Sequence, residues 1–119
     1  MRLIIAEAAT RSGDLATALQ QLDAVRKCRI ASAHYLAYQS ADQDSVLQKV
    51  LQERTFEMPY CGQRWFDMRR LNAEGRMQTV NRYDGTSKVI ATLAPNSPRY
   101  TFQIPIQVMY YNSGWPQNP

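Results

Sequence analysis

Glu53 and Glu57 are the two side chains whose spacing comes closest to that of a catalytic pair. Residues four positions apart project from the same face of a helix. Two carboxyl groups on one face could act as the acid and the base or nucleophile of a glycoside hydrolase. Carboxylates at this spacing pair more often with arginines, so we expect a network of ion pairs here rather than catalysis. The nearby cations are Arg54, Arg64, Arg69 and Arg70.

Nucleophilic and metal chemistry has few candidates, because the chain holds 2 cysteines and 1 histidine. Cys28 and Cys61 lack the C-x-x-C spacing of a zinc site, and His34 alone cannot complete one. Cys28 follows the apolar rhythm of a helix and is expected to be buried, whereas Cys61 precedes a turn glycine and is expected to be exposed. A disulfide between them depends on geometry. A nucleophilic pair of Cys61 with His34 is a weaker hypothesis, and we expect no catalytic residue, metal site or cofactor.

Aromatic side chains gather near the C-terminal end, where Tyr110, Tyr111 and Trp115 could form a platform for sugar rings. The interpretation that we favour is that they anchor the tail against a core. Three amide side chains in the same segment could contact a ligand or satisfy the backbone of an irregular tail, and both roles stay open. These amides are Asn112, Gln117 and Asn118.

The charge balance gives little support to a nucleic-acid partner. The chain carries 14 basic and 10 acidic side chains, for a formal net charge of +4. The excess lies in residues 61–119, and most of the cations are arginines, which suit pairing with carboxylates. Because no dense basic stripe is present, we expect a solvated surface and internal ion pairs, and no nucleic acid.

A helical hairpin is predicted over residues 1–29. Apolar residues recur three and four positions apart in residues 1–12 and again from residue 15 onward. Gly13 and Asp14 supply the end of one helix and the cap of the next. Two helices joined by so short a turn resemble one tetratricopeptide repeat. The sequence holds one copy, and a single hairpin cannot bury its own apolar face.

Two further helices are predicted over residues 44–72, after a connecting loop or short helical turn. Asp42 or Asp44 can cap the first of them. Pro59 should end it, because proline lacks the amide that a helix interior uses. A short amphipathic helix follows, and the ion pairs of this segment are expected to hold it around Trp65 and Phe66.

Residues 76–119 are predicted to form an irregular, proline-rich tail. Asp84 and Gly85 indicate a turn, and residues 89–93 a short strand. The apolar side chains between Phe102 and Trp115 are too numerous to leave in water, so we expect this tail to pack against other residues. The fold class predicted from these elements is mainly α, with a tetratricopeptide-like hairpin, further helices and an irregular tail.

The length of 119 residues, 45% of them hydrophobic, is typical of one globular domain. No stretch approaches the roughly 20 apolar residues of a membrane-spanning helix. The first residues do not resemble a complete signal peptide, because Glu7 interrupts the apolar run. Either the protein stays in the cytoplasm, or the chain is part of a longer gene product.

Three blocks of residues together resemble the SusD/RagB family of nutrient-binding lipoproteins of Gram-negative bacteria. The first block covers residues 3–29, the second covers residues 53–70 and ends in RWFDMRR, and the third covers residues 102–119 with FQIP and a closing QNP. They follow the family's order across nearly the whole chain. Pro59 and Cys61 stand where the family usually has a small residue and an acid, and Val108 replaces a common glutamate. These departures concern local ion pairing and helix geometry.

The resemblance implies a cell-surface nutrient-binding protein without catalytic activity. Relatives sit on the outer membrane through an N-terminal lipid and cap a SusC-type TonB-dependent transporter. They capture oligosaccharides, or peptides in RagB-like members. Because full-length relatives are several times longer, the chain is expected to match their C-terminal part, with the signal peptide and lipid anchor upstream of Met1.

Ligand contacts are therefore expected outside these residues. The resemblance implies a structural role for the motif of the second block, with Arg64 and Asp67 in ion pairs or caps. The residues of this motif are Glu53, Arg54, Glu57, Gly62, Arg64, Trp65, Phe66, Asp67 and Arg69.

Two other classes remain as alternatives. A glycoside hydrolase would use Glu53 and Glu57, and hydrolysis that Glu57→Gln abolishes would favour it. An intracellular helical-repeat adaptor would fit the hairpin, but it does not explain the RWFDMRR and QNP blocks.

Overall fold

The computed structural model describes all residues from 1 to 119. About half of them lie in five α-helices, and one two-stranded sheet is present. The predicted mainly α fold is confirmed. The chain divides into two compact units, residues 1–64 and residues 65–119.

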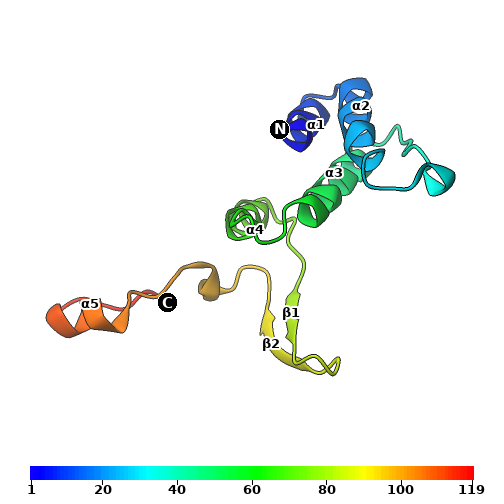
Figure 1. The fold of residues 1–119 in the computed structure, drawn as a ribbon. Helices are drawn as coiled ribbons and strands as arrows, with labels where there is room; N and C mark the ends of the chain where they lie inside the picture. Colours follow the sequence, from blue (N-terminus) through cyan, green and yellow to red (C-terminus); the bar gives the residue numbers. More distant parts are fainter. The chain divides into compact units, whose positions relative to one another are not determined.

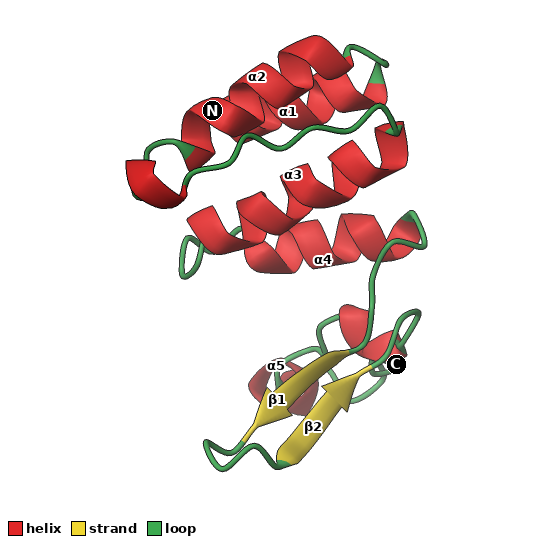
Figure 2. Cartoon of the chain, turned by 90° about the vertical axis from the view of Figure 1, so that its right-hand side faces the viewer, coloured by secondary structure: helices red, strands yellow, loops and turns green.

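The first unit begins with the predicted helical hairpin (Figures 1 and 2). α1 covers Arg2–Arg11 and α2 covers Leu15–Arg26. Gly13 joins them with a φ of 87°, a conformation that glycine adopts without the steric cost of a Cβ atom. Asp14 then caps α2, because its carboxylate accepts a hydrogen bond from the Thr17 N–H over 3.0 Å.

α3 covers Gln43–Glu57 and packs against both helices of the hairpin. Of the two candidate caps, Asp42 is the N-cap, and its carboxylate accepts a hydrogen bond from the Ser45 N–H over 2.8 Å. The helix ends before Met58 and Pro59, as predicted. The connection from α2 contains a single 3₁₀ turn, η1, at Ser32–His34.

Small and branched apolar side chains form the core of this unit. Ala6 and Ala18 are fully buried, and their small size lets α1 and α2 approach closely. α3 covers the apolar face that the hairpin alone would leave open. The buried cluster consists of Leu3, Ala6, Ala18, Leu22, Val46 and Val50.

The second unit contains a helix, a β-hairpin and a final short helix. α4 covers Arg64–Ala73, so that its first residue belongs to the first unit. β1, Val80–Tyr83, pairs antiparallel with β2, Val89–Leu93, which confirms the predicted strand. A 3₁₀ turn, η2, at Pro98–Tyr100 precedes α5, which covers Ile106–Tyr111.

The turn of the β-hairpin is built around one carboxylate. Asp84 Oδ1 accepts hydrogen bonds from the Thr86 N–H over 2.7 Å and from the Thr86 hydroxyl over 2.6 Å. These hydrogen bonds lower the pKa of Asp84. The predicted turn at this aspartate is therefore confirmed.

The prediction that Cys28 is buried is wrong. Cys28 is an exposed free thiol, and its Sγ donates to the Ala24 carbonyl over 3.4 Å. The helical rhythm does not extend to it, because α2 ends at Arg26 and residues 27–29 form a turn. Cys61 is exposed, as expected, and it is also a free thiol, so the two cysteines form no disulfide here.

Candidate functional site

The two candidate catalytic glutamates are both held in ion pairs. Glu53 Oε1 lies 3.3 Å from Arg26 Nε and 3.0 Å from Lys49 Nζ. The partners differ from the prediction, which placed them among arginines close by in the sequence. Lys49 stands four residues before Glu53 on the same helix, a spacing that the sequence already offered. Arg26 comes from α2, and only the tertiary fold brings it to α3.

Glu57 is bound by a second arginine from the end of the hairpin. Arg29 donates from Nε and Nη2 to the two carboxylate oxygens over 2.7 and 2.8 Å. This fork-like hydrogen bonding lowers the pKa of Glu57, against the opposing effect of burial. A general acid of a glycoside hydrolase needs the opposite shift, a raised pKa. The geometry therefore favours a structural role for this carboxylate.

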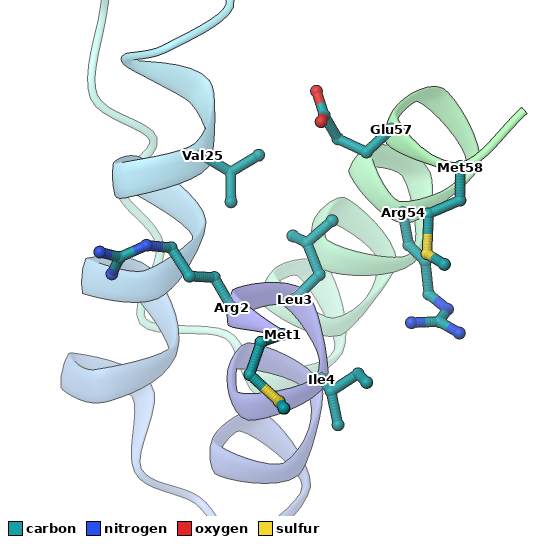
Figure 3. A pocket seen from close by; sticks show the side chains of 8 residues that line it. All are labelled: Met1, Arg2, Leu3, Ile4, Val25, Arg54, Glu57 and Met58. Atoms are coloured by element: carbon teal, nitrogen blue, oxygen red, sulfur yellow. The ribbon is translucent and has the colours of Figure 1, made fainter.

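A cavity of about 320 Å³ lies beside these residues in the first unit, where the start of α1 meets the ends of α2 and α3 (Figure 3). Apolar side chains form most of its lining, and Arg2, Arg54 and Glu57 contribute polar groups. No pattern in the sequence indicates this cavity, because three helices must assemble to form it. Its lining residues are Met1, Arg2, Leu3, Ile4, Val25, Arg54, Glu57 and Met58.

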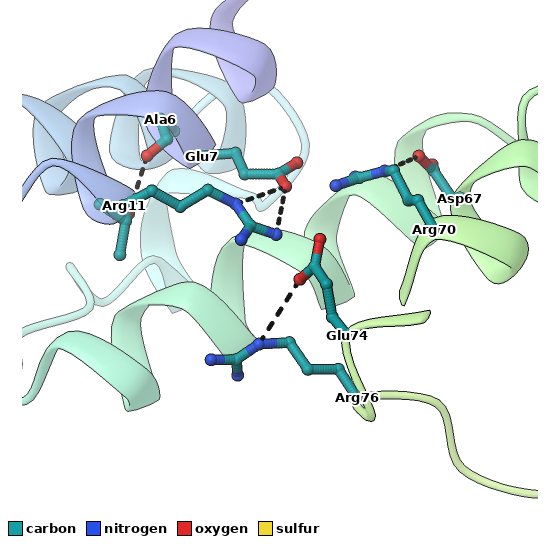
Figure 4. Close-up of polar contacts among 8 residues, drawn as sticks. Ala6, Glu7, Arg11, Asp67, Arg70, Glu74 and Arg76 are labelled. Atoms are coloured by element: carbon teal, nitrogen blue, oxygen red, sulfur yellow. Dashed lines mark hydrogen bonds and ion pairs between the residues drawn. The ribbon is translucent and has the colours of Figure 1, made fainter. Parts of the chain in front are cut away.

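The RWFD segment forms the first turn of α4, and its four side chains have different environments. Arg64 Nη1 donates to the Thr55 hydroxyl over 3.1 Å rather than to a carboxylate. Asp67 is buried and accepts from Arg70 Nε over 2.9 Å, so of the two expected roles, ion pair or cap, the structure shows the ion pair (Figure 4). This pair spans three residues of the same helix.

Trp65 lies at the centre of an aromatic stack within the second unit. Its ring centroid is 4.6 Å from that of Phe102 and 6.0 Å from that of the buried Tyr100, with interplanar angles near 25°. Such stacking adds to the free energy of simple burial. Phe66, in contrast, is 65% exposed, so the prediction that both aromatics form the centre of this segment is wrong for Phe66.

The amides of the closing QNP block hold the backbone of the tail. Gln117 accepts from the Ile104 N–H over 2.7 Å and donates to the Ile104 carbonyl over 3.0 Å. Asn118 donates to the Phe102 carbonyl over 2.9 Å. Asn112 donates to the Val108 carbonyl at the end of α5. Of the two roles left open for these amides, the structure supports backbone satisfaction.

The three aromatic residues nearest the C-terminal end are not buried. Tyr110, Tyr111 and Trp115 are all exposed, and the rings of the two tyrosines meet edge to face with centroids 5.3 Å apart. The prediction that these side chains pack against a core is therefore wrong for this structure. The amide hydrogen bonds hold the backbone of this segment, and the three aromatic side chains lie on its outside.

The remaining candidates for chemistry are not assembled. His34 in η1 and Cys61 after α3 are both exposed and share no contact. No group of three or more histidine, cysteine or acidic side chains is close enough to hold a metal ion. None of the helices combines the length and apolar character that crossing a membrane requires.

Comparison with known proteins agrees with the three sequence blocks. The model of the SusD family matches residues 1–119, which is the whole chain. No curated protein and no solved structure shows a significant match. Members of this family are in general non-catalytic, nutrient-binding proteins associated with the outer membrane. The chain belongs to the SusD/RagB family.

Proposed function

We propose that this protein binds an oligosaccharide at the cell surface and delivers it to a SusC-type TonB-dependent transporter. The observation that carries the proposal is the family match over residues 1–119. A peptide ligand, as in RagB-like members, is the second candidate within the same function.

The contacts of the second block support a structural role for most of its motif. Glu53 and Glu57 tie α3 to the hairpin, and Asp67 is paired within α4. Gly62 has a φ of 70°, a conformation suited to glycine at the turn between α3 and α4. In the proposed function these residues maintain the scaffold, and ligand contacts lie outside residues 1–119.

The proposed mechanism is binding followed by a conformational change, in which no covalent bond of the ligand is broken. A ligand shifts such an equilibrium only by its difference in affinity between the open and closed states. The ion pairs of Glu53 and Glu57 fit this mechanism, since both carboxylates are already neutralised by cations. A hydrolase would instead require one of them to stay protonated near neutral pH.

The transporter partner is tested by isolating the protein, tagged at its C-terminus, from the outer membrane of its native bacterium. We expect a TonB-dependent transporter to co-purify in a fixed ratio and protease added to intact cells to degrade the protein. Recovery from the cytoplasm without such a transporter would favour the adaptor instead.

The ligand class is tested by calorimetry on the same purified protein with panels of oligosaccharides and peptides. We expect saturable binding of an oligosaccharide with no change in its chain length after incubation. Saturable binding of peptides alone would identify a RagB-like member. Release of shorter sugars by the purified protein but not by its Glu57→Gln variant would contradict the proposal.

A further inference from the structure

Asp84 in the turn of the β-hairpin is followed by a glycine, whereas every other aspartate of the chain precedes a residue that carries a side chain. The backbone nitrogen of the residue after an aspartate can attack the side-chain carboxyl carbon. A side chain on that residue hinders the attack, and glycine has none. Gly85 also has a φ of 91°, so the turn itself requires a glycine here. The shape of this turn therefore places an unhindered nitrogen beside a carboxyl group.

The chemistry open to these two residues is a cyclisation followed by hydrolysis. The Gly85 nitrogen bonds to Asp84 Cγ, and the amide proton leaves with the O–H of the carboxyl group as one water molecule. The product is a five-membered succinimide ring. Water then opens the ring at Cγ, which restores the aspartate, or at the main-chain carbonyl carbon, which gives isoaspartate. One water is released and one is consumed, so the net change is an isomerisation that needs no other reactant.

The hydrogen bonds of the turn treat the two reacting groups differently. The Gly85 N–H donates no hydrogen bond within the chain. Asp84 Oδ1, in contrast, accepts from the Thr86 N–H over 2.7 Å, from the Thr86 hydroxyl over 2.6 Å and from the Lys88 N–H over 3.3 Å. The attacking nitrogen is therefore untethered, while the group that it would attack is held by three donors.

These donors suppress the reactive form of the carboxyl group. Loss of water requires the protonated acid, because an ionised carboxylate would have to expel an oxide ion. The hydrogen bonds from the hydroxyl and the N–H of Thr86 lower the pKa of Asp84 and so favour the ionised carboxylate. They also fix the orientation of the carboxylate relative to the backbone. Thr86 is therefore the residue that most restrains the reaction.

We propose that Asp84 and Gly85 form a site of spontaneous succinimide and isoaspartate formation, and that Thr86 slows this reaction by holding the carboxylate. The atoms involved belong to residues 84–86, so the reaction needs neither a partner nor an open surface. Isoaspartate lengthens the backbone by a methylene group and removes the carboxylate from its donors. The neighbouring strand pair, Tyr83 with Val89, should then lose its alignment. The reaction is independent of the proposed function, since neither a ligand nor a transporter takes part in it.

The test is prolonged incubation of the purified full chain at neutral pH, with isoaspartate located by peptide mapping and mass spectrometry. Isomerisation leaves the mass of a peptide unchanged, which distinguishes it from deamidation of an asparagine. We expect isoaspartate at position 84 of the parent chain. Thr86→Val removes the hydroxyl donor but keeps the N–H, and it should raise the rate about threefold. Thr86→Ser keeps the hydroxyl and should react at the rate of the parent chain.

The matched control is Thr92→Val, which removes a hydroxyl from the same β-hairpin. This hydroxyl donates to Asn81 Oδ1 over 3.1 Å and has no contact with Asp84, so the rate should stay that of the parent chain. The parent chain unfolded in guanidinium chloride reports the reaction without the turn, and it should react faster than the folded chain.

Three results would overturn the proposal. Absence of isoaspartate at position 84 in both the unfolded chain and Thr86→Val would show that the site does not react. Equal rates in the folded parent chain, the unfolded chain and Thr86→Val would show that the turn gives no protection. Equal acceleration by Thr86→Val and Thr92→Val would show that a looser hairpin, and not the contact with Asp84, sets the rate.

Discussion

At the scale of single residues, Trp65 and Phe66 show how strongly the environment of neighbours can differ. Trp65 stacks against Tyr100 and Phe102, whereas Phe66 is exposed to water. Adjacent residues on a helix point about 100° apart, so only one of the two can face the same packing partners. Trp65 is therefore expected to contribute more to the stability of the fold than Phe66.

The substitution Trp65→Ala should lower the free energy of unfolding by about 2 kcal/mol, because it removes a partly buried ring and its stacking contacts. Phe66→Ala is the matched control, and it should change stability by less than about 0.5 kcal/mol. Urea denaturation followed by circular dichroism measures both. Equal losses for the two variants would show that Trp65 has no special packing role.

At the scale of elements, an ion pair joins the end of the helical hairpin to the last turn of α3. Arg29 follows α2, and Glu57 is the final residue of α3. Side-chain hydrogen bonds from the guanidinium lower the pKa of Glu57, so the folded state favours the charged carboxylate. A lowered pKa stabilises the fold above the ordinary pKa, and this contribution disappears as the pH falls through the lowered value.

The substitution Glu57→Gln should lower the melting temperature by about 1–3 °C at pH 7, since the arginine of this pair is largely exposed. The difference from the parent chain should vanish well below pH 4.5, the ordinary pKa of a glutamate. Thermal melts across this pH range measure it. The exchanged pair, Arg29→Glu with Glu57→Arg, should restore much of the loss, and a difference that persists in acid would contradict an ion-pair effect.

At the scale of the whole molecule, the chain divides into two compact units, residues 1–64 and residues 65–119. The first unit has a small core of six buried apolar residues, to which all three of its α-helices contribute. The second unit is organised by the aromatic stack, the β-hairpin and the hydrogen bonds between Gln117 and Ile104. Leu22 is the largest apolar side chain that is fully buried in the first unit.

The substitution Leu22→Ala should destabilise the first unit by about 3 kcal/mol, because a cavity in so small a core cannot be refilled easily. Amide hydrogen exchange resolved along α1, α2 and α3 should accelerate in all three helices together. The control Leu36→Ala changes a leucine that is 79% exposed and should leave exchange unaltered. Acceleration in α2 alone would show that the three helices do not share one core.

Much of the fold was predictable because it depends on local chemistry. Helical periodicity, Gly13, the aspartate caps and Pro59 mark the limits of the first three helices. The turn at Asp84 and the strand at residues 89–93 were likewise visible. The candidate site was less predictable, since the partners of Glu53 and Glu57 include Arg26 and Arg29, which are distant in the sequence.

The sequence by itself determined the helical elements, the order of the three motif blocks and, through them, the SusD/RagB family. Spacing and residue type carry this information, because caps, turns and periodic faces act over a few residues. Only the tertiary structure decided that Cys28 and Phe66 are exposed, that the arginine partners of the two glutamates come from the hairpin, and that the tail presents its apolar side chains outward. Burial and long-range pairing depend on which faces meet in three dimensions. A periodic pattern identifies the apolar face of a helix, but it does not identify the element that packs against that face.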